Sequence, residues 1–92
     1  MNFSSALKQV KKGKRIARRG WNGKGMFVFL TQPIETKINN EVSNGLKEIG
    51  YNFLPCLAIK TADNNICFGW LASQTDMLAN DWGVLETRKV KR

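Results

Sequence analysis

The sequence contains no histidine, the side chain that most often acts as a general base near neutral pH and as a metal ligand. A Ser-His-Asp triad, a Cys-His pair and a zinc site with histidine ligands are therefore excluded. Acidic residues are also few, and Asp63, Asp76, Asp81 and Glu86 of the C-terminal half have no spacing that favours two of them converging. Because glycosidases and two-metal nucleases need converging carboxylates, we expect a protein that is not an enzyme and that needs no cofactor and no metal.

Cysteine and long apolar segments are scarce as well. Cys56 and Cys67 lie eleven positions apart and form no C-x-x-C motif. Their neighbours are apolar, which favours two small core hydrophobes over a disulfide. No run approaches the roughly 18 apolar residues of a membrane-spanning helix, and the first residues lack the apolar core of a signal peptide. We therefore expect a soluble, cytoplasmic protein without a membrane partner.

Positive charge is what the sequence has in excess. Its 92 residues suffice for one domain, residues 1–92, and carry 15 Lys and Arg against 7 Asp and Glu, a net charge of +8. Most of the basic residues lie near the two ends of the sequence: Lys8, Lys11, Lys12, Lys14, Arg15, Arg18, Arg19, Lys24, Arg88, Lys89, Lys91 and Arg92. Such clusters predict a partner that carries phosphates, and the alternative is a solvated surface. For residues 87–92 we expect a basic tail that frays.

Apolar residues near the N-terminus recur at helical spacing, at Phe3, Ala6, Leu7 and Val10. Asn2 can cap the start of this helix, and Gly13 can end it in a left-handed conformation. Lysines 8, 11 and 12 then lie mostly off the apolar stripe, so we expect them on the surface.

Runs of apolar residues predict five strands. Residues 14–18 and 26–30 form a hairpin around the Asn22-Gly23 turn, and residues 57–61 and 66–70 form another around residues 63–65. A last strand begins at Trp82. Residues 34–53 fit a short helix, which we favour, or an irregular excursion, because several Asn and Gly residues weaken the helix propensity.

A short helix is predicted between the fourth and fifth strands. Ser73 is its N-cap, with Asp76 three residues later, and residues 81–83 end it. Residues 77–79 (Met-Leu-Ala) supply its apolar side. Together the elements predict a small α+β domain with an antiparallel sheet, an N-terminal helix and a short helix before the last strand.

The segment from Trp21 to Gly25 carries the most specific candidate chemistry. Its glycine turns can present backbone amides to an anion, and Trp21 offers a stacking face. Arg18 and Arg19 offer guanidinium groups to phosphates. Neither the P-loop nor the dinucleotide-binding glycine pattern is present. The alternative is a hairpin turn with a half-buried tryptophan.

A second candidate region surrounds the start of the short helix, where Trp70 and Trp82 flank residues 73–76. Helix N-termini favour phosphate or carboxylate groups through their free amides and the helix dipole. Asp76 would partly neutralise that field, so its alternative role is capping. We expect Asp81 to be a turn or ion-pair residue and Asp63 a turn residue.

Two long stretches of this sequence resemble a known family. They are RIARRGWNGKGM at residues 15–26 and WLASQTDMLANDW at residues 70–82, with further likeness at residues 2–3, 6–7, 13–14 and 60–63. The pattern is similar to that of small phage and prophage proteins, the Thoeris anti-defence 2 family. The likeness covers nearly the whole chain apart from residues 31–53 and the basic tail.

The resemblance implies a sponge that sequesters an immune signal in the cytoplasm of the infected bacterial host. Members of the family bind the cyclic ADP-ribose isomer that Thoeris systems make on infection, and they hold it without destroying it. Members of the family form homotetramers that bind the ligand at subunit interfaces, and some of them also capture cyclic nucleotides at a separate site. For this chain the implied ligand is a cyclic ADP-ribose isomer, with cyclic dinucleotides or oligonucleotides as further candidates.

Such a ligand has a purine for stacking, a pyrophosphate for cations and amides, and ribose hydroxyls for polar side chains. The ligand-binding candidates are Arg18, Arg19, Trp21, Asn22, Lys24, Trp70, Ser73, Thr75 and Asp76. The alternative function is nucleic-acid binding, motivated by the charge of +8, although the tryptophans sit beside glycine turns and a helix cap rather than along a basic strand face. A third possibility is direct binding to a host defence protein.

Overall fold

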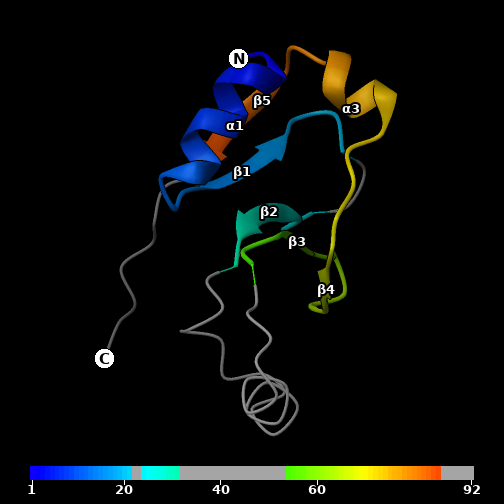
Figure 1. Ribbon diagram of the computed structural model, residues 1–92. Helices are drawn as coiled ribbons and strands as arrows, with labels where there is room; N and C mark the ends of the chain where they lie inside the picture. Colours follow the sequence, from blue (N-terminus) through cyan, green and yellow to red (C-terminus); the bar gives the residue numbers. More distant parts are fainter. Residues whose placement is uncertain (22–23, 32–53, 86–92) are drawn as a thin grey trace, which may run out of the picture.

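The computed structural model describes residues 1–21, 24–31 and 54–85, which form a five-stranded sheet and two helices (Figure 1). The elements follow in the order α1 (Phe3–Lys11), β1 (Arg15–Arg18), β2 (Phe27–Leu30), β3 (Leu57–Lys60), β4 (Ile66–Phe68), α3 (Gln74–Leu78) and β5 (Trp82–Leu85). The strand order across the sheet is β4-β3-β2-β1-β5, and every neighbouring pair is antiparallel. The predicted α+β fold with its two helices is confirmed.

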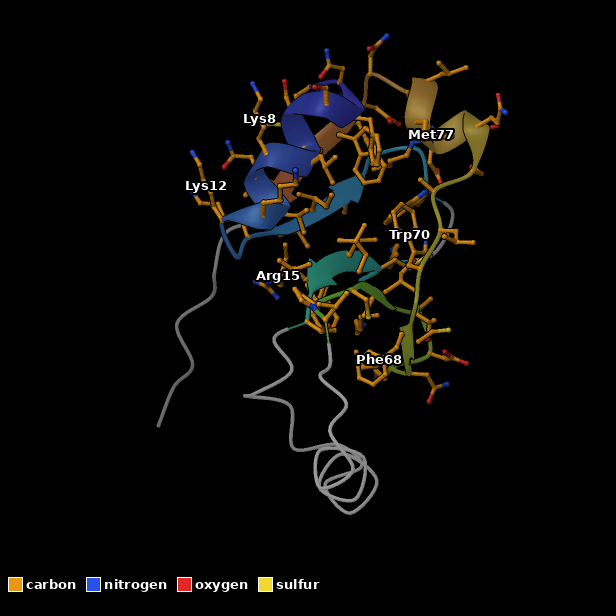
Figure 2. All side chains as sticks on the ribbon, in the orientation of Figure 1. Lys8, Lys12, Arg15, Phe68, Trp70 and Met77 are labelled. Carbon is orange, nitrogen blue, oxygen red and sulfur yellow. The ribbon has the colours of Figure 1, made fainter. Side chains whose placement is uncertain are left out.

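Helix α1 forms where the apolar spacing predicts it. Asn2 caps it, because the Asn2 Oδ1 accepts the backbone N–H of Ser5 at 2.9 Å. Beyond the helix end, Gly13 has a φ of 94°, in the left-handed region that favours glycine. Lys8 and Lys12 are exposed and point away from the sheet on the outer side of the helix (Figure 2). These lysines are therefore surface residues, as predicted.

Alternate residues of the strands build the core beneath α1. Ile16 of β1 lies opposite Val28 of β2 and Val84 of β5, and both Ile16 and Val28 are fully buried. Trp82, which pairs with Arg18, continues this face and is only 3% exposed. Because β5 returns to the free edge of β1, residues from both ends of the described chain share one core. Burial of their apolar surface is the main stabilising term of the fold.

The turn between β3 and β4 is also as predicted. Asn64 has a φ of 68°, and the Thr61 Oγ1 accepts the backbone N–H of Asn65 at 3.0 Å. The Thr61 hydroxyl also donates to Asp63, and this hydrogen bond holds the pKa of the Asp63 carboxyl below its ordinary value. Asp63 is a turn residue.

Two predictions about apolar residues are wrong. Cys67 is not a core hydrophobe, because it lies on the edge strand β4, where all three residues are exposed; Cys56 is half-buried, and both are free thiols. Met77 and Leu78 do not pack as an apolar side of α3, because they are 45% and 77% exposed; of the three predicted residues, Ala79 alone packs against the core. Helix α3 is only five residues long, and its caps stabilise it instead of apolar burial.

Some predictions fall on segments beyond the described ranges. They include the helix or irregular excursion at residues 34–53 and the basic tail at residues 87–92. Within the described residues, neither helix has the length and apolar character needed to cross a membrane.

Candidate functional site

Arg18, at the end of β1, holds two carboxylates that come from distant parts of the sequence. Its Nη1 lies 2.8 Å from the Oδ1 of Asp76, and its Nε lies 2.8 Å from the Oδ1 of Asp81. The side chains of Arg18 and Asp76 are only 15% and 14% exposed, so this ion pair is largely shielded from water. Hydrogen bonds to Asp81 and Asp76 raise the pKa of the guanidinium further above its ordinary value. The expectation that no two acids converge is therefore wrong: Asp76 and Asp81 meet at one guanidinium.

Asp76 links β1, the loop after it and the start of α3. The Ser73 Oγ accepts the Asp76 N–H at 3.0 Å while the Ser73 N–H donates to the Asp76 Oδ2 at 3.4 Å, which completes a capping box. The Asp76 Oδ1 also accepts the indole N–H of Trp21 at 3.2 Å. Partial desolvation acts to raise the pKa of Asp76, but the hydrogen bonds from Arg18, Trp21 and Ser73 outweigh it and hold the pKa below 3.8.

Three tryptophans pack edge to face beside these charges. The ring centroids of Trp21 and Trp82 lie 5.3 Å apart, those of Trp70 and Trp82 6.2 Å, and those of Trp21 and Trp70 6.4 Å. The Trp82 indole N–H donates to the backbone carbonyl of Asp76 at 2.8 Å. Trp82 is buried, whereas Trp21 and Trp70 are half-buried and keep part of their ring surface accessible. Arg18, Asp76, Asp81 and these three rings form what we call the arginine–tryptophan cluster.

Gly20 contacts this cluster through its backbone. Its backbone N–H donates to the Asp81 Oδ2 at 2.8 Å, and the Asp81 carboxylate receives this bond in addition to those from Arg18. The hydrogen bond from Arg18 is the main reason that the pKa of Asp81 lies below its ordinary value, and the Gly20 amide adds to it. A Cβ at Gly20 would lie 2.8 Å from the same Oδ2 and 3.3 Å from the Arg18 Nη2. A side chain at position 20 would therefore displace this carboxylate from its place beside Arg18.

The substitution Gly20→Ala is expected to lower the free energy of unfolding by about 1–3 kcal/mol, because Asp81 must move away from Arg18 to admit the methyl group. Urea unfolding followed by tryptophan fluorescence measures the change. Gly83→Ala is the matched control, since a Cβ there meets nothing within 4 Å. Equal stability of the two variants would contradict the tight packing inferred at Gly20.

The structure brings some of the predicted site residues together and leaves others apart. Arg18, Trp21, Trp70 and Asp76 lie in the cluster, and Ser73 caps the helix that carries Asp76. Three others are exposed: Arg19 directly follows β1, Thr75 lies on α3, and Lys24 lies in the turn before β2. Asn22 lies outside the described residues. Figure 2 shows Trp70 on the chain segment that leads from β4 to α3.

Two members of the cluster were missing from the predicted site, Asp81 and Trp82. The antiparallel pairing of β1 with β5 sets Trp82 opposite Arg18, which places Asp81 beside the same guanidinium. No local pattern in the sequence gives this register. The nearest signal was the composition of residues 76–82, where two acids and a tryptophan occur within seven positions.

Comparison with known proteins gives two findings. Residues 1–85 match the family model of the Thoeris anti-defense 2-like domain, a range that includes the whole arginine–tryptophan cluster. The protein named Thoeris anti-defense 2 from Bacillus phage SP01 is 40% identical over 87 residues, which cover 92% of this chain and 94% of that protein. Both findings confirm the resemblance seen in residues 15–26 and 70–82. The chain belongs to the Thoeris anti-defense 2 family.

Proposed function

We propose that this protein counters Thoeris defence by binding a cyclic ADP-ribose isomer in the cytoplasm of the infected host and holding it uncleaved. The name of the phage SP01 relative supports the anti-Thoeris part of the proposal. The observation that carries the ligand is the pair of half-buried indole rings, Trp21 and Trp70, which lie close together, with the exposed Arg19 two residues before Trp21 in the sequence. A purine stacks on an aromatic ring, and a pyrophosphate binds guanidinium groups.

The contacts within the cluster favour Arg19 over Arg18 as the pyrophosphate-binding residue. The guanidinium of Arg18 is already occupied by Asp76 and Asp81. Arg19 is anchored through its backbone, because its N–H donates to the carbonyl oxygen of Asp81 at 3.1 Å, while its side chain is exposed. We therefore assign Arg18 to positioning the site and propose the exposed Arg19 and Lys24 as the cations that bind the pyrophosphate.

Hydroxyl groups at the start of α3 suit the ribose. Ser73 accepts the Asp76 N–H through its Oγ and retains its own O–H as a donor, and Thr75, two residues further along the chain, is exposed. Asp76 itself is engaged by Arg18, Trp21 and Ser73, so we assign it to holding the site in shape. Asn22 remains a candidate contact.

Binding without cleavage agrees with the state of the carboxylates. The pKa values of Asp76 and Asp81 are both lowered, so both groups stay ionised at neutral pH and neither is suited to donate a proton to a leaving group. Their shared partner, Arg18, also occupies the space in which a substrate would have to lie between two catalytic carboxylates. We therefore propose sequestration instead of hydrolysis.

We further propose that the site is completed by other subunits of a homotetramer. A ligand pocket usually buries more than about 70% of its ligand, which a small domain does not easily provide alone. Leu71 and Leu78 flank the capping box and are 88% and 77% exposed. Apolar side chains in this position are suited to a subunit contact next to the ligand.

A retention experiment tests the function. The purified protein is mixed with a cyclic ADP-ribose isomer, freed of unbound ligand, denatured by heat, and the released material is identified by chromatography and mass spectrometry. Intact ligand released in stoichiometric amount supports the proposal. Recovery of linear ADP-ribose points to an enzyme, and no retained ligand from any Thoeris signal rejects the function.

The substitution Arg19→Gln is expected to weaken ligand binding by at least about tenfold, because a charge-assisted hydrogen bond contributes about 1.5–3 kcal/mol. Isothermal titration calorimetry measures the dissociation constant. Lys12→Gln removes the same charge from the outer side of α1 and serves as the control, with no more than about a twofold change from the altered net charge. Equal weakening in both variants would show that overall charge, and not Arg19, governs affinity.

A further inference from the structure

The chain departs from regular strand geometry directly after β4. The backbone N–H groups of Gly69 and Trp70 both donate to the carbonyl oxygen of Leu57, each at 2.9 Å. Gly69 has a φ of 83°, in the left-handed region. Two consecutive residues that face one partner residue, the first of them a left-handed glycine, form a β-bulge of the type that needs glycine at its first position. The bulge follows the last regular pair of β3 and β4, Ala58 with Phe68.

The bulge changes the face of the sheet on which the Trp70 side chain lies. Leu57 packs against the core, so the position opposite it belongs to the core side, while the preceding residue, Phe68, lies on the other face. In a regular strand Gly69 would occupy that position alone, and Trp70 would follow on the face of Phe68. Because the bulge sets Gly69 and Trp70 opposite the same residue, Trp70 lies on the core side instead.

The surroundings of Trp70 and of the next residue agree with this change of face. The Trp70 ring packs against the core, and its centroid lies 6.2 Å from that of Trp82 and 6.4 Å from that of Trp21. Leu71, which regular alternation would turn toward the core, is 88% exposed. In Figure 2, Trp70 lies on the side of β2 and β3 that faces α1, and Phe68 lies on the other side. The bulge therefore determines that an indole ring, and not a leucine side chain, joins the arginine–tryptophan cluster.

The conformation of Gly69, and not a lack of space, restricts which residues fit at this position. A Cβ there would meet nothing within 4 Å, but a φ of 83° is strained for most side chains. The strain is greatest for β-branched residues, whereas asparagine adopts left-handed conformations several times more readily than most residues. A β-branched side chain at this position therefore favours a return to regular alternation, which turns Trp70 away from the cluster.

We propose that Gly69 is a positioning residue for ligand recognition, because its bulge places the Trp70 ring beside Trp21. This inference rests on the proposed function, in which the pair of half-buried rings holds the purine. Gly69 has no side chain, and its N–H is bonded to Leu57, so its effect on the ligand is transmitted through Trp70.

A matched pair of glycine substitutions tests the proposal. Gly69→Val and Gly13→Val introduce the same side chain at glycines with φ values of 83° and 94°, and a Cβ at either position meets nothing within 4 Å. Both variants are expected to lose stability, with a fall in melting temperature of about 5–10 °C each. In calorimetric titrations with a cyclic ADP-ribose isomer, Gly69→Val is expected to bind about tenfold more weakly, whereas Gly13→Val keeps its affinity.

Two further comparisons show whether the effect acts through Trp70. In a double-mutant cycle, Gly69→Val is expected to add no further loss of affinity to Trp70→Ala, because the ring that it positions is already absent. Gly69→Asn is expected to restore the affinity, since asparagine tolerates the left-handed conformation. Gly69→Ala, with less strain than Gly69→Val, is expected to lie between the two and provides the same test if Gly69→Val does not fold.

A measurement without ligand separates this inference from the proposed function. Closely packed indole rings give an exciton couplet in the far-ultraviolet circular dichroism spectrum, and Trp70→Phe defines the part that Trp70 contributes. We expect Gly69→Val to lose this part and Gly13→Val to keep it. Loss of the couplet in Gly69→Val supports the positioning of Trp70 even if the unmodified protein retains no ligand, and the retention experiment then rejects the proposed function alone.

Three results would overturn the inference. The first is an unchanged couplet and an unchanged affinity in Gly69→Val. The second is an equal loss of affinity in Gly69→Val and Gly13→Val, which would make stability the only cause. The third is an additive loss of affinity when Gly69→Val is combined with Trp70→Ala, which would show that Gly69 acts on the ligand independently of the Trp70 ring.

Discussion

Asp76→Ala is expected to lower the free energy of unfolding by about 3 kcal/mol. The substitution removes the half of the α3 capping box that the Asp76 carboxylate makes, worth up to about 1 kcal/mol, and a charge-assisted hydrogen bond to a largely shielded guanidinium, worth about 2 kcal/mol. It also leaves the Trp21 indole N–H without its acceptor. Urea unfolding monitored by tryptophan fluorescence measures the loss. Asp63→Ala removes the same charge from the exposed β3–β4 turn and is expected to cost clearly less.

The pH dependence of stability provides an independent check on Asp76. Its pKa in the folded protein lies below 3.8, so its contribution to stability is complete above that value and is lost as the pH falls through the folded pKa. Asp81 behaves in the same sense, because its pKa is lowered too. The unmodified protein should therefore lose stability below about pH 4 more steeply than Asp76→Ala. If the free energy of unfolding fell equally steeply with decreasing pH in both proteins, Asp76 would not be held ionised by the cluster.

Trp21→Ala is expected to reduce the affinity for the cyclic ADP-ribose ligand at least about 100-fold. Stacking of one base on an aromatic side chain contributes about 1–3 kcal/mol, and loss of the ring also removes one of the two indole rings that pack against Trp70. Because Trp21 packs against Trp82 as well, the variant is expected to lose about 2 kcal/mol of stability. Calorimetric titration, well below the melting temperature of the variant, measures the affinity.

Trp21→Phe separates recognition from packing. Phenylalanine keeps an aromatic face for the purine but cannot donate the hydrogen bond to Asp76. We expect this variant to recover most of the affinity while remaining less stable than the unmodified protein. Full affinity in Trp21→Ala would instead place the ligand away from this ring, with the retention experiment still deciding whether the protein holds a ligand at all.

The local structure was predictable because its signals are local. Helical spacing from Phe3 to Val10, the caps at Asn2 and Ser73, and the turn at Asn64 each depend on residues a few positions apart. The strands that flank these turns followed from the same patterns. The fold class could therefore be assembled from neighbouring residues alone.

The centre of the site was only partly predictable, because it depends on the pairing of β1 with β5. That pairing joins strands from opposite ends of the described chain, and the sequence carries no local mark of its register. The sequence predicted Asp81 to be a turn or ion-pair residue but did not identify its partner. It also did not predict that Asp81 and Asp76 bind the same guanidinium. The errors at Cys67 and Leu78 have a related cause. An apolar neighbourhood in the sequence does not show whether a residue lies on an edge strand or on a short helix held by its caps.

The ion pairs of Arg18 have a consequence for the order of folding. They join residues 58 and 63 positions apart, so the chain must close a long loop before either carboxylate reaches the guanidinium. The site therefore forms only when β5 has docked, and partly folded chains lack it. A ligand that requires this geometry binds only the completed fold and raises its stability through mass action, so the captured signal itself would help to keep the protein that holds it folded.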